Sequence, residues 1–186
     1  PVKLEEVTSK HISSPSITIY KKFDHYSQCG LENKIIGVFG KRLNDLDEIA
    51  EQAALAARYF GFVLAPEANV GERYFKKNGY NKMLVISPYD KRRGIYISTT
   101  GKGKKPFTDG ISLINDYLKK PKNETEIDYL ETIDFEEILQ ELETFDADKL
   151  QTHDHVASLI QCFLTASKVL KPTAVNHTIP LASVFW

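Results

Sequence analysis

The chain has 186 residues, 42% hydrophobic and 26% charged, values that exclude a disordered or fibrous protein and indicate one globular domain. Its net charge of −1 conceals a segregation, because basic residues gather between positions 91 and 105 and acidic residues between 124 and 148. No apolar run reaches the ~20 residues of a membrane-spanning helix and no signal segment opens the chain, so we expect a soluble, intracellular protein.

The first predicted elements form a hairpin. Residues 16–23 alternate apolar and polar side chains and are rich in β-branched and aromatic types, which favours a strand. Residues 33–42 predict a second strand, separated from the first by the polar stretch 24–32. The segments 1–15 and 171–186 are irregular, and we expect a single domain between them.

A helix follows the hairpin. Asn44 or Asp45 can cap its start, acidic residues occupy its first turns, and Gly61 is expected to end it. Its apolar stripe has helical spacing and consists of Leu46, Ile49, Ala53, Ala57 and Phe60.

Short apolar runs then alternate with a helix. Residues 62–68 and 83–87 predict buried strands, with a helix at 71–79 between them, and residues 94–99 predict a further strand at a hairpin edge. This alternation is typical of an α/β protein with a parallel or mixed sheet flanked by helices.

Three further helices are predicted in the second half of the chain. The first begins at Thr108 or Asp109 and ends near position 120, the second begins at Asp134, and the last covers residues 154–170.

Two carboxylates are candidates for a metal site. Glu67 ends an apolar strand, where a buried acid must be paired, bound to a cation or exposed, and the alternative is an ordinary ion pair with a lysine. Asp154 begins the last helix, where the alternative is a helix cap. If both face the carboxyl edge of the sheet, they can hold Mg²⁺ or Mn²⁺. Two such ions are a known arrangement for phosphodiester hydrolysis.

Histidines and cysteines give weaker signals. His153 and His155 flank Asp154 and could supply a ligand or carry a proton, although histidines at a helix start are more often simply exposed. Cys29 and Cys162 form no CxxC pair, so we interpret them as ordinary thiols.

Two basic clusters flank the strand predicted at 94–99. Beside Lys91, the residues that we expect to contact nucleic-acid phosphates are Arg92, Arg93, Lys102, Lys104 and Lys105. Because glycines surround Lys102, the second cluster is predicted to be flexible enough to follow a duplex. The alternative is a solvated hairpin tip without a ligand.

Taken in order, these segments resemble a known family, the nuclease domain of tailed-bacteriophage large terminases. The resemblance covers residues 17 to about 170. Its most specific piece is the E-x-N-x-G stretch Glu67-Ala68-Asn69-Val70-Gly71. Residues 74–75 and 79–80 follow it, and the other matching segments are 17–21, 40–42, 56–60, 141–145 and 153–159.

The resemblance implies a ribonuclease-H-like fold and an endonuclease that cuts concatemeric double-stranded DNA during genome packaging. By position, Glu67 and Asp154 would be the second and third metal-binding catalytic acids, with Asn69 and His153 in support. It also implies Mg²⁺ or Mn²⁺ as the cofactor, an upstream ATPase domain and the phage portal as partners, and the host cytoplasm as the location.

The chain departs from this family at its start. Such domains place their first acid on a central strand ahead of the hairpin, and this chain starts at Pro1-Val2. We therefore expect a fragment that lacks the first strand and its acid, with weakened metal binding. No G-x-x-x-x-G-K-[ST] motif occurs in the sequence, so no packaging ATPase is expected within it.

Two other functions stay open. The first is another ribonuclease-H-like nuclease, such as a junction resolvase, which would prefer branched over linear DNA. The second is a DNA-binding or docking module of the packaging motor without catalytic activity, which would show no metal-dependent cleavage.

Overall fold

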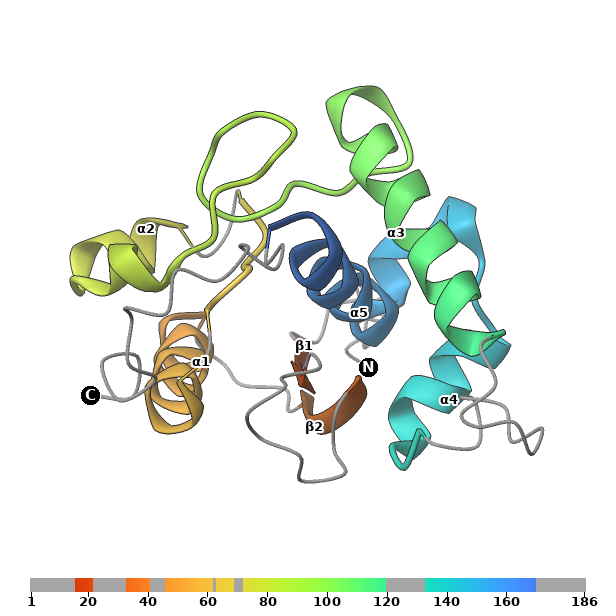
Figure 1. Ribbon diagram of the computed structural model, residues 1–186, viewed down its shortest axis with the longest axis horizontal. Helices are drawn as coiled ribbons and strands as arrows, with labels where there is room; N and C mark the ends of the chain where they lie inside the picture. Colours follow the sequence, from red (N-terminus) through yellow and green to blue (C-terminus); the bar gives the residue numbers. More distant parts are fainter. Residues whose placement is uncertain are drawn as a thin grey trace, which may run out of the picture.

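The computed structural model describes the central part of the chain in six segments. These are residues 16–21, 33–40, 46–61, 63–68, 72–119 and 133–169. Within them the protein is mixed α/β, with five α-helices and a two-stranded antiparallel sheet (Figure 1). No helix in these segments is both long enough and apolar enough to cross a bilayer.

The predicted hairpin strands are present. Strand β1, Ser16–Lys21, pairs antiparallel with β2, Lys34–Gly40, and the register shifts once, between Ile19 and Tyr20. The residues 24–32 that connect the strands lie outside the described segments.

Strand β1 lies against helix α5, Asp154–Leu164. The amide of Thr18 donates a hydrogen bond to Oγ of Ser158 (2.9 Å), and the thiol of Cys162 donates to the carbonyl of Thr18 (3.1 Å). Burial of this sulfur raises the pKa of Cys162 to about 12. The thiol is therefore neutral at physiological pH, as expected of an ordinary cysteine.

Helix α1, Leu46–Phe60, ends where the sequence predicts, because Gly61 adopts a left-handed conformation with φ of 71°. Its alanines face the interior, and Ala54 is completely buried. The prediction was wrong for Phe60, which is 45% exposed. This last residue of the helix stacks edge-on against Tyr59 instead, with ring centroids 4.8 Å apart.

After α1, the predicted segments pair in the expected parallel and antiparallel directions, but they do not form regular strands. Leu64 forms a single parallel bridge with Leu84, and Ile86 a single antiparallel bridge with Arg93, but no continuous strand forms in these segments. One reason is Pro66, which has no amide hydrogen to extend the parallel ladder. Its carbonyl instead accepts a hydrogen bond from the amide of Ile95 (3.0 Å).

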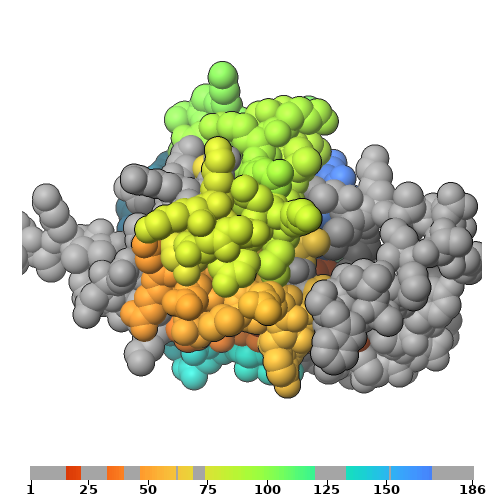
Figure 2. All heavy atoms as spheres, turned by 90° about the vertical axis from the view of Figure 1, so that its left-hand side faces the viewer, coloured from red at the N-terminus to blue at the C-terminus, as the bar shows by residue number. Residues whose placement is uncertain are grey.

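A small core joins α1 to the next helix. Helix α2, Glu72–Lys77, is followed by a left-handed Gly79 and the short 3₁₀ helix η1, Tyr80–Met83. The buried members of this core are Ala50, Ala53, Ala54, Phe75 and Leu84. Figure 2 shows α1 and α2 side by side on one face of the molecule.

The larger core lies between α5 and two helices that pack on it. Helix α3, Lys104–Leu118, approaches α5 so closely that a side-chain carbon on Gly110 would collide with Ile160. Helix α4, Glu136–Glu143, contributes Ile138, which is completely buried. After Leu164 the chain continues as a π-helical turn over Thr165–Val169.

The start of α3 differs from the prediction. The helix begins at Lys104, directly after the 3₁₀ turn η2, Gly101–Gly103, and not at Thr108 or Asp109. Pro106 is compatible with this early start, because a residue in the first turn of a helix needs no amide donor.

Candidate functional site

Glu67 lies in the extended segment that pairs with Leu84, and its side chain is half-buried. Burial is the main cause that raises the pKa of Glu67 above its ordinary value, and the negative charge of Asp154 is the second. No lysine or arginine in the described part of the chain forms an ion pair with it. The ordinary ion pair considered from the sequence is therefore not found in these segments.

Asp154 is the first residue of α5 and not its cap. The capping position belongs to His153, whose side chain makes no capping hydrogen bond. Glu141 of α4 takes the place of a capping side chain. It accepts a hydrogen bond from the amide of Val156 (3.0 Å). The capping interpretation of Asp154 was therefore wrong.

Glu67 and Asp154 are distant in the sequence, and the negative charge of Asp154 contributes to the raised pKa of Glu67 in the fold. Two partly buried acids of like charge are favourable ligands for a divalent cation, which would offset both charges. The described residues contain no group of three or more acidic, histidine or cysteine side chains that could hold a metal. The pair could supply two carboxylate ligands to a divalent cation.

His153 is buried and has a structural role. Its ring packs edge-on against Phe145, with centroids 5.3 Å apart, and its Nε2 accepts a long hydrogen bond from the amide of Asp146 (3.4 Å). The exposed position considered for it is therefore wrong. His155 is half-buried, and its Nδ1 lies 2.6 Å from Oγ of Ser16. Asn69 lies outside the described residues.

The two predicted DNA-binding arginines are engaged within the fold. Arg92 forms an ion pair with Asp90 (2.7 Å) and lies over the ring of Tyr96, 5.9 Å from its centroid. Burial alone would raise the pKa of Asp90, but hydrogen bonds from Arg92 and Ser87, with the charge of Arg92, lower it. Arg93 donates a hydrogen bond to the main-chain carbonyl of Asn81. Arg92 therefore stabilises its own turn, and Arg93 links that turn to η1.

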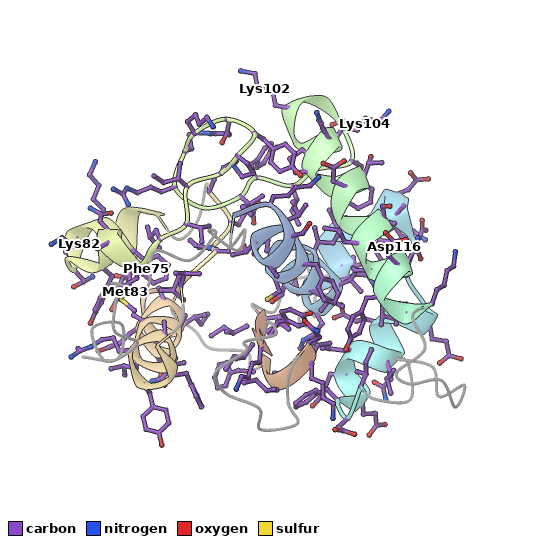
Figure 3. The ribbon with its side chains drawn as sticks, in the orientation of Figure 1. Phe75, Lys82, Met83, Lys102, Lys104 and Asp116 are labelled. Atoms are coloured by element: carbon purple, nitrogen blue, oxygen red, sulfur yellow. The ribbon has the colours of Figure 1, made fainter. Side chains whose placement is uncertain are left out.

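The predicted DNA-binding lysines are exposed, but they are not on a flexible loop. Lys102 lies in η2, whereas Lys104 and Lys105 form the first turn of α3. Figure 3 shows Lys102 and Lys104 at the same end of the molecule, directed away from its body. None of the three makes an ion pair with another described residue. These lysines therefore lie in helical turns and not at the tip of a hairpin.

One cluster was missed by the sequence analysis. The hydroxyl of Tyr89 donates a hydrogen bond to Oδ2 of Asp109 (2.8 Å), and Nζ of Lys168 lies 3.9 Å from the same oxygen. Burial, followed by the hydrogen bond to Asp109 and the charge of Asp109, raises the pKa of Tyr89. The sequence offered only Asp109 as a candidate helix cap, and nothing in it pointed to Tyr89.

Comparisons with known proteins give no further assignment: no protein-family model, no curated protein and no solved structure matches this chain.

Proposed function

We propose that this chain is a metal-dependent endonuclease domain, the nuclease part of a tailed-phage large terminase with a ribonuclease-H-like fold. Its substrate would be concatemeric double-stranded DNA, cut during genome packaging in the host cytoplasm. In that setting an ATPase domain and the phage portal would be its partners. The proposal rests on the order of motifs in the sequence and on one observation in the structure.

That observation is the half-buried side chain of Glu67, whose pKa is raised by burial and, second, by the negative charge of Asp154. A half-buried glutamate beside a like charge destabilises the fold unless something offsets it, and no lysine or arginine in the described segments forms an ion pair with Glu67 itself. Such an arrangement is more readily explained by a bound cation than by a structural role. Hard carboxylate oxygens favour Mg²⁺ or Mn²⁺.

Each group of residues has a distinct part in this proposal. Glu67 and Asp154 would hold the cation, which supplies Lewis-acid chemistry for phosphodiester hydrolysis when bound. The exposed lysines at the start of α3 would hold DNA phosphates independently of base sequence. Because a proton on Glu67 competes with the cation, we expect metal affinity to rise as pH increases through the raised pKa of this carboxyl.

The test compares Glu67→Gln and Asp154→Asn with the wild type in two measurements. The first is thermal stabilisation by MnCl₂, and the second is cleavage of linear duplex DNA with Mg²⁺ or Mn²⁺. We expect each variant to lose the stabilisation and to cleave at least about a hundredfold more slowly, because a metal ligand has been replaced. Metal binding is measured separately from cleavage because the described residues contain no group of three or more side chains that could hold a metal, so a variant could bind metal without cleaving DNA.

Asp116→Asn is the matched control. This carboxylate is exposed on α3, and Figure 3 shows it well below the lysines at the helix start. The control should respond to metal and cleave as the wild type does. Variants at Glu67 and Asp154 that keep full metal-dependent activity would contradict the proposal. Preferential cutting of branched DNA would indicate a resolvase, and DNA binding without any metal response would indicate a docking module.

A further inference from the structure

Two basic segments lie at one end of the molecule. We define the basic turn as residues 87–93, which carries Lys91 and Arg92, and the basic helix start as residues 101–105. Figure 1 shows the loop that follows α2 standing beside the beginning of α3. Lys91 and the three lysines of the basic helix start are exposed and form no ion pair with another described residue.

The basic turn has a defined conformation. The amide of Ser87 donates to the carbonyl of Arg92 (2.7 Å), and the amide of Lys91 donates to the carbonyl of Ser87 (3.0 Å). Lys91 adopts a left-handed conformation with φ of 62°, which is unfavourable for a residue with a side chain. The turn therefore needs anchoring contacts to hold its lysine in this position.

The first anchor is Tyr89. Its ring reaches from the turn to α3, where its hydroxyl donates the 2.8 Å hydrogen bond to Asp109. Asp109 lies in the same helix that begins with Lys104 and Lys105. The bond is half-buried and has a carboxylate acceptor, which makes it stronger than a bond between neutral groups.

The second anchor is a backbone contact at Gly103. The amide of Ser98 donates to the carbonyl of Gly103 (3.3 Å), so the chain that leaves the basic turn touches the basic helix start. A side-chain carbon on Gly103 would lie only 2.6 Å from Cβ of Ser98. Only glycine permits this approach, which fixes the basic helix start against the chain that follows the basic turn.

The chain that directly follows the basic turn runs beside Glu67. Gly94 packs so closely on Pro66 and Ala68 that no side chain could be accommodated there, and the amide of Ile95 bonds to Pro66. A nucleic acid bound to the basic turn would therefore be held by a segment that is anchored, at its C-terminal end, to the backbone on both sides of Glu67.

We infer that Tyr89 is a positioning residue whose hydrogen bond to Asp109 fixes the basic turn and the basic helix start as one phosphate-binding surface for duplex DNA. This inference rests on the proposed function for its ligand. Cations held in fixed positions can contact several phosphates of a stiff duplex at once, without the cost of ordering each segment on binding. If the segments moved independently, fewer phosphates would be neutralised together.

Tyr89→Phe tests this inference because it removes only the hydroxyl. Binding of a fluorescent linear duplex is measured over a series of NaCl concentrations without divalent metal, so that no cleavage occurs. We expect the affinity at about 0.1 M salt to fall roughly threefold to tenfold, and the slope of log K against log salt to become shallower by about 0.9, the loss of one phosphate contact.

The slope separates positioning from a structural role. A variant that is merely less stable has a smaller folded fraction at every salt concentration, which lowers the affinity but leaves the slope unchanged. An unchanged slope would overturn the inference, and so would failure of the wild type to bind duplex DNA. Asp109→Asn keeps an acceptor for Tyr89 and should keep the wild-type slope, whereas Asp109→Ala should match Tyr89→Phe.

Tyr59→Phe is the matched control, since it deletes the same hydroxyl from a side chain that is 82% exposed on α1. It should leave both affinity and slope unchanged. The outcome is independent of the metal test, because a shallower slope for Tyr89→Phe with no metal-dependent cleavage would support the surface and reject the nuclease. Normal metal-dependent cleavage with an unchanged slope for Tyr89→Phe would support the nuclease and reject the surface.

Discussion

The first turns of α3 and α5 carry opposite charges, and only one of them suits the helix that it begins. Asp154 lies where the partial positive charge at a helix N-terminus stabilises an acid. Lys104 and Lys105 lie at the equivalent place in α3, where the same partial charge opposes a cation. The acid at the start of α5 therefore stabilises its helix, whereas the lysines at the start of α3 do not stabilise theirs.

At α5 the helix start alone accounts for Asp154, and the unusual residue is Glu67, a half-buried acid whose pKa is raised by burial and by the charge of Asp154. At α3 the unusual residues are the lysines themselves. A phosphate ligand would offset both their mutual repulsion and the unfavourable helix end.

The largest expected effect comes from reversing the charges at the start of α3. In the double variant Lys104→Glu and Lys105→Glu, we expect duplex affinity to fall at least about tenfold because two phosphate contacts are lost. The free energy of unfolding should rise by on the order of 0.5 kcal/mol, because acids suit this helix end. Salt-dependent DNA binding and thermal unfolding measure the two effects.

A control with the same change in net charge is available at α2. Lys76→Glu with Lys77→Glu reverses two exposed lysines in the last turn of that helix, where a cation is favourable. Stability should fall and affinity should change little. If both double variants weaken DNA binding equally, total charge and not the basic helix start determines the affinity.

A smaller effect is expected from removing the cap of α5. Glu141→Ala deletes the acceptor for the amide of Val156 and should lower the free energy of unfolding by about 1 kcal/mol, or Tm by about 2–4 °C. Glu143→Ala on the same helix is exposed and should cost much less. Asp154→Ala should also cost less than Glu141→Ala, because relief of repulsion with Glu67 offsets the lost helix-end interaction. A larger cost for Asp154→Ala would show that it stabilises α5 more than Glu141 does.

Local patterns were enough to predict the hairpin, α1 and the start of α5. Alternation in residues 16–21 and helical spacing in α1 are properties of the segments themselves. The start of α3 was missed because Gly101, Gly103 and Pro106 are typical of loops. In the structure Gly103 is required for a close contact with Ser98, a constraint of chain geometry that residue propensities do not contain.

For the candidate site, too, local sequence identified residues but not the contacts that depend on packing. The sequence selected Glu67 and Asp154 by residue type and position, but their electrostatic interaction depends on how distant segments pack. The partners of Arg92, Arg93 and Tyr89 were not predicted, because each partner lies on a different turn or helix or depends on the exact turn geometry. Burial of His153 against Phe145 was missed for the same reason.

The smallest expected effect tests the comparison at α5 directly, through the stability of metal-free Glu67→Gln. The pKa of Glu67 in the fold lies above its ordinary value of 4.5, so the folded protein holds this proton more tightly than the unfolded chain does. The stability contributed by this group is therefore present below pH 4.5 and is lost as pH rises through the raised pKa. At neutral pH the variant, which cannot ionise at this position, should be more stable than the wild type.

We expect this difference to be at most about 1 kcal/mol, because Glu67 is partly exposed to solvent. It should vanish on acidification, which chemical denaturation at pH 4 and pH 7.5 in EDTA would measure. MnCl₂ should reverse the order at neutral pH by stabilising only the wild type, since a cation between Glu67 and Asp154 converts their repulsion into two attractive contacts. A wild type that is already the more stable protein in EDTA at neutral pH would mean that the protein itself neutralises Glu67. The main reason to infer a metal at α5 would then disappear, whereas the reason to infer a phosphate ligand at the lysines of α3 would remain.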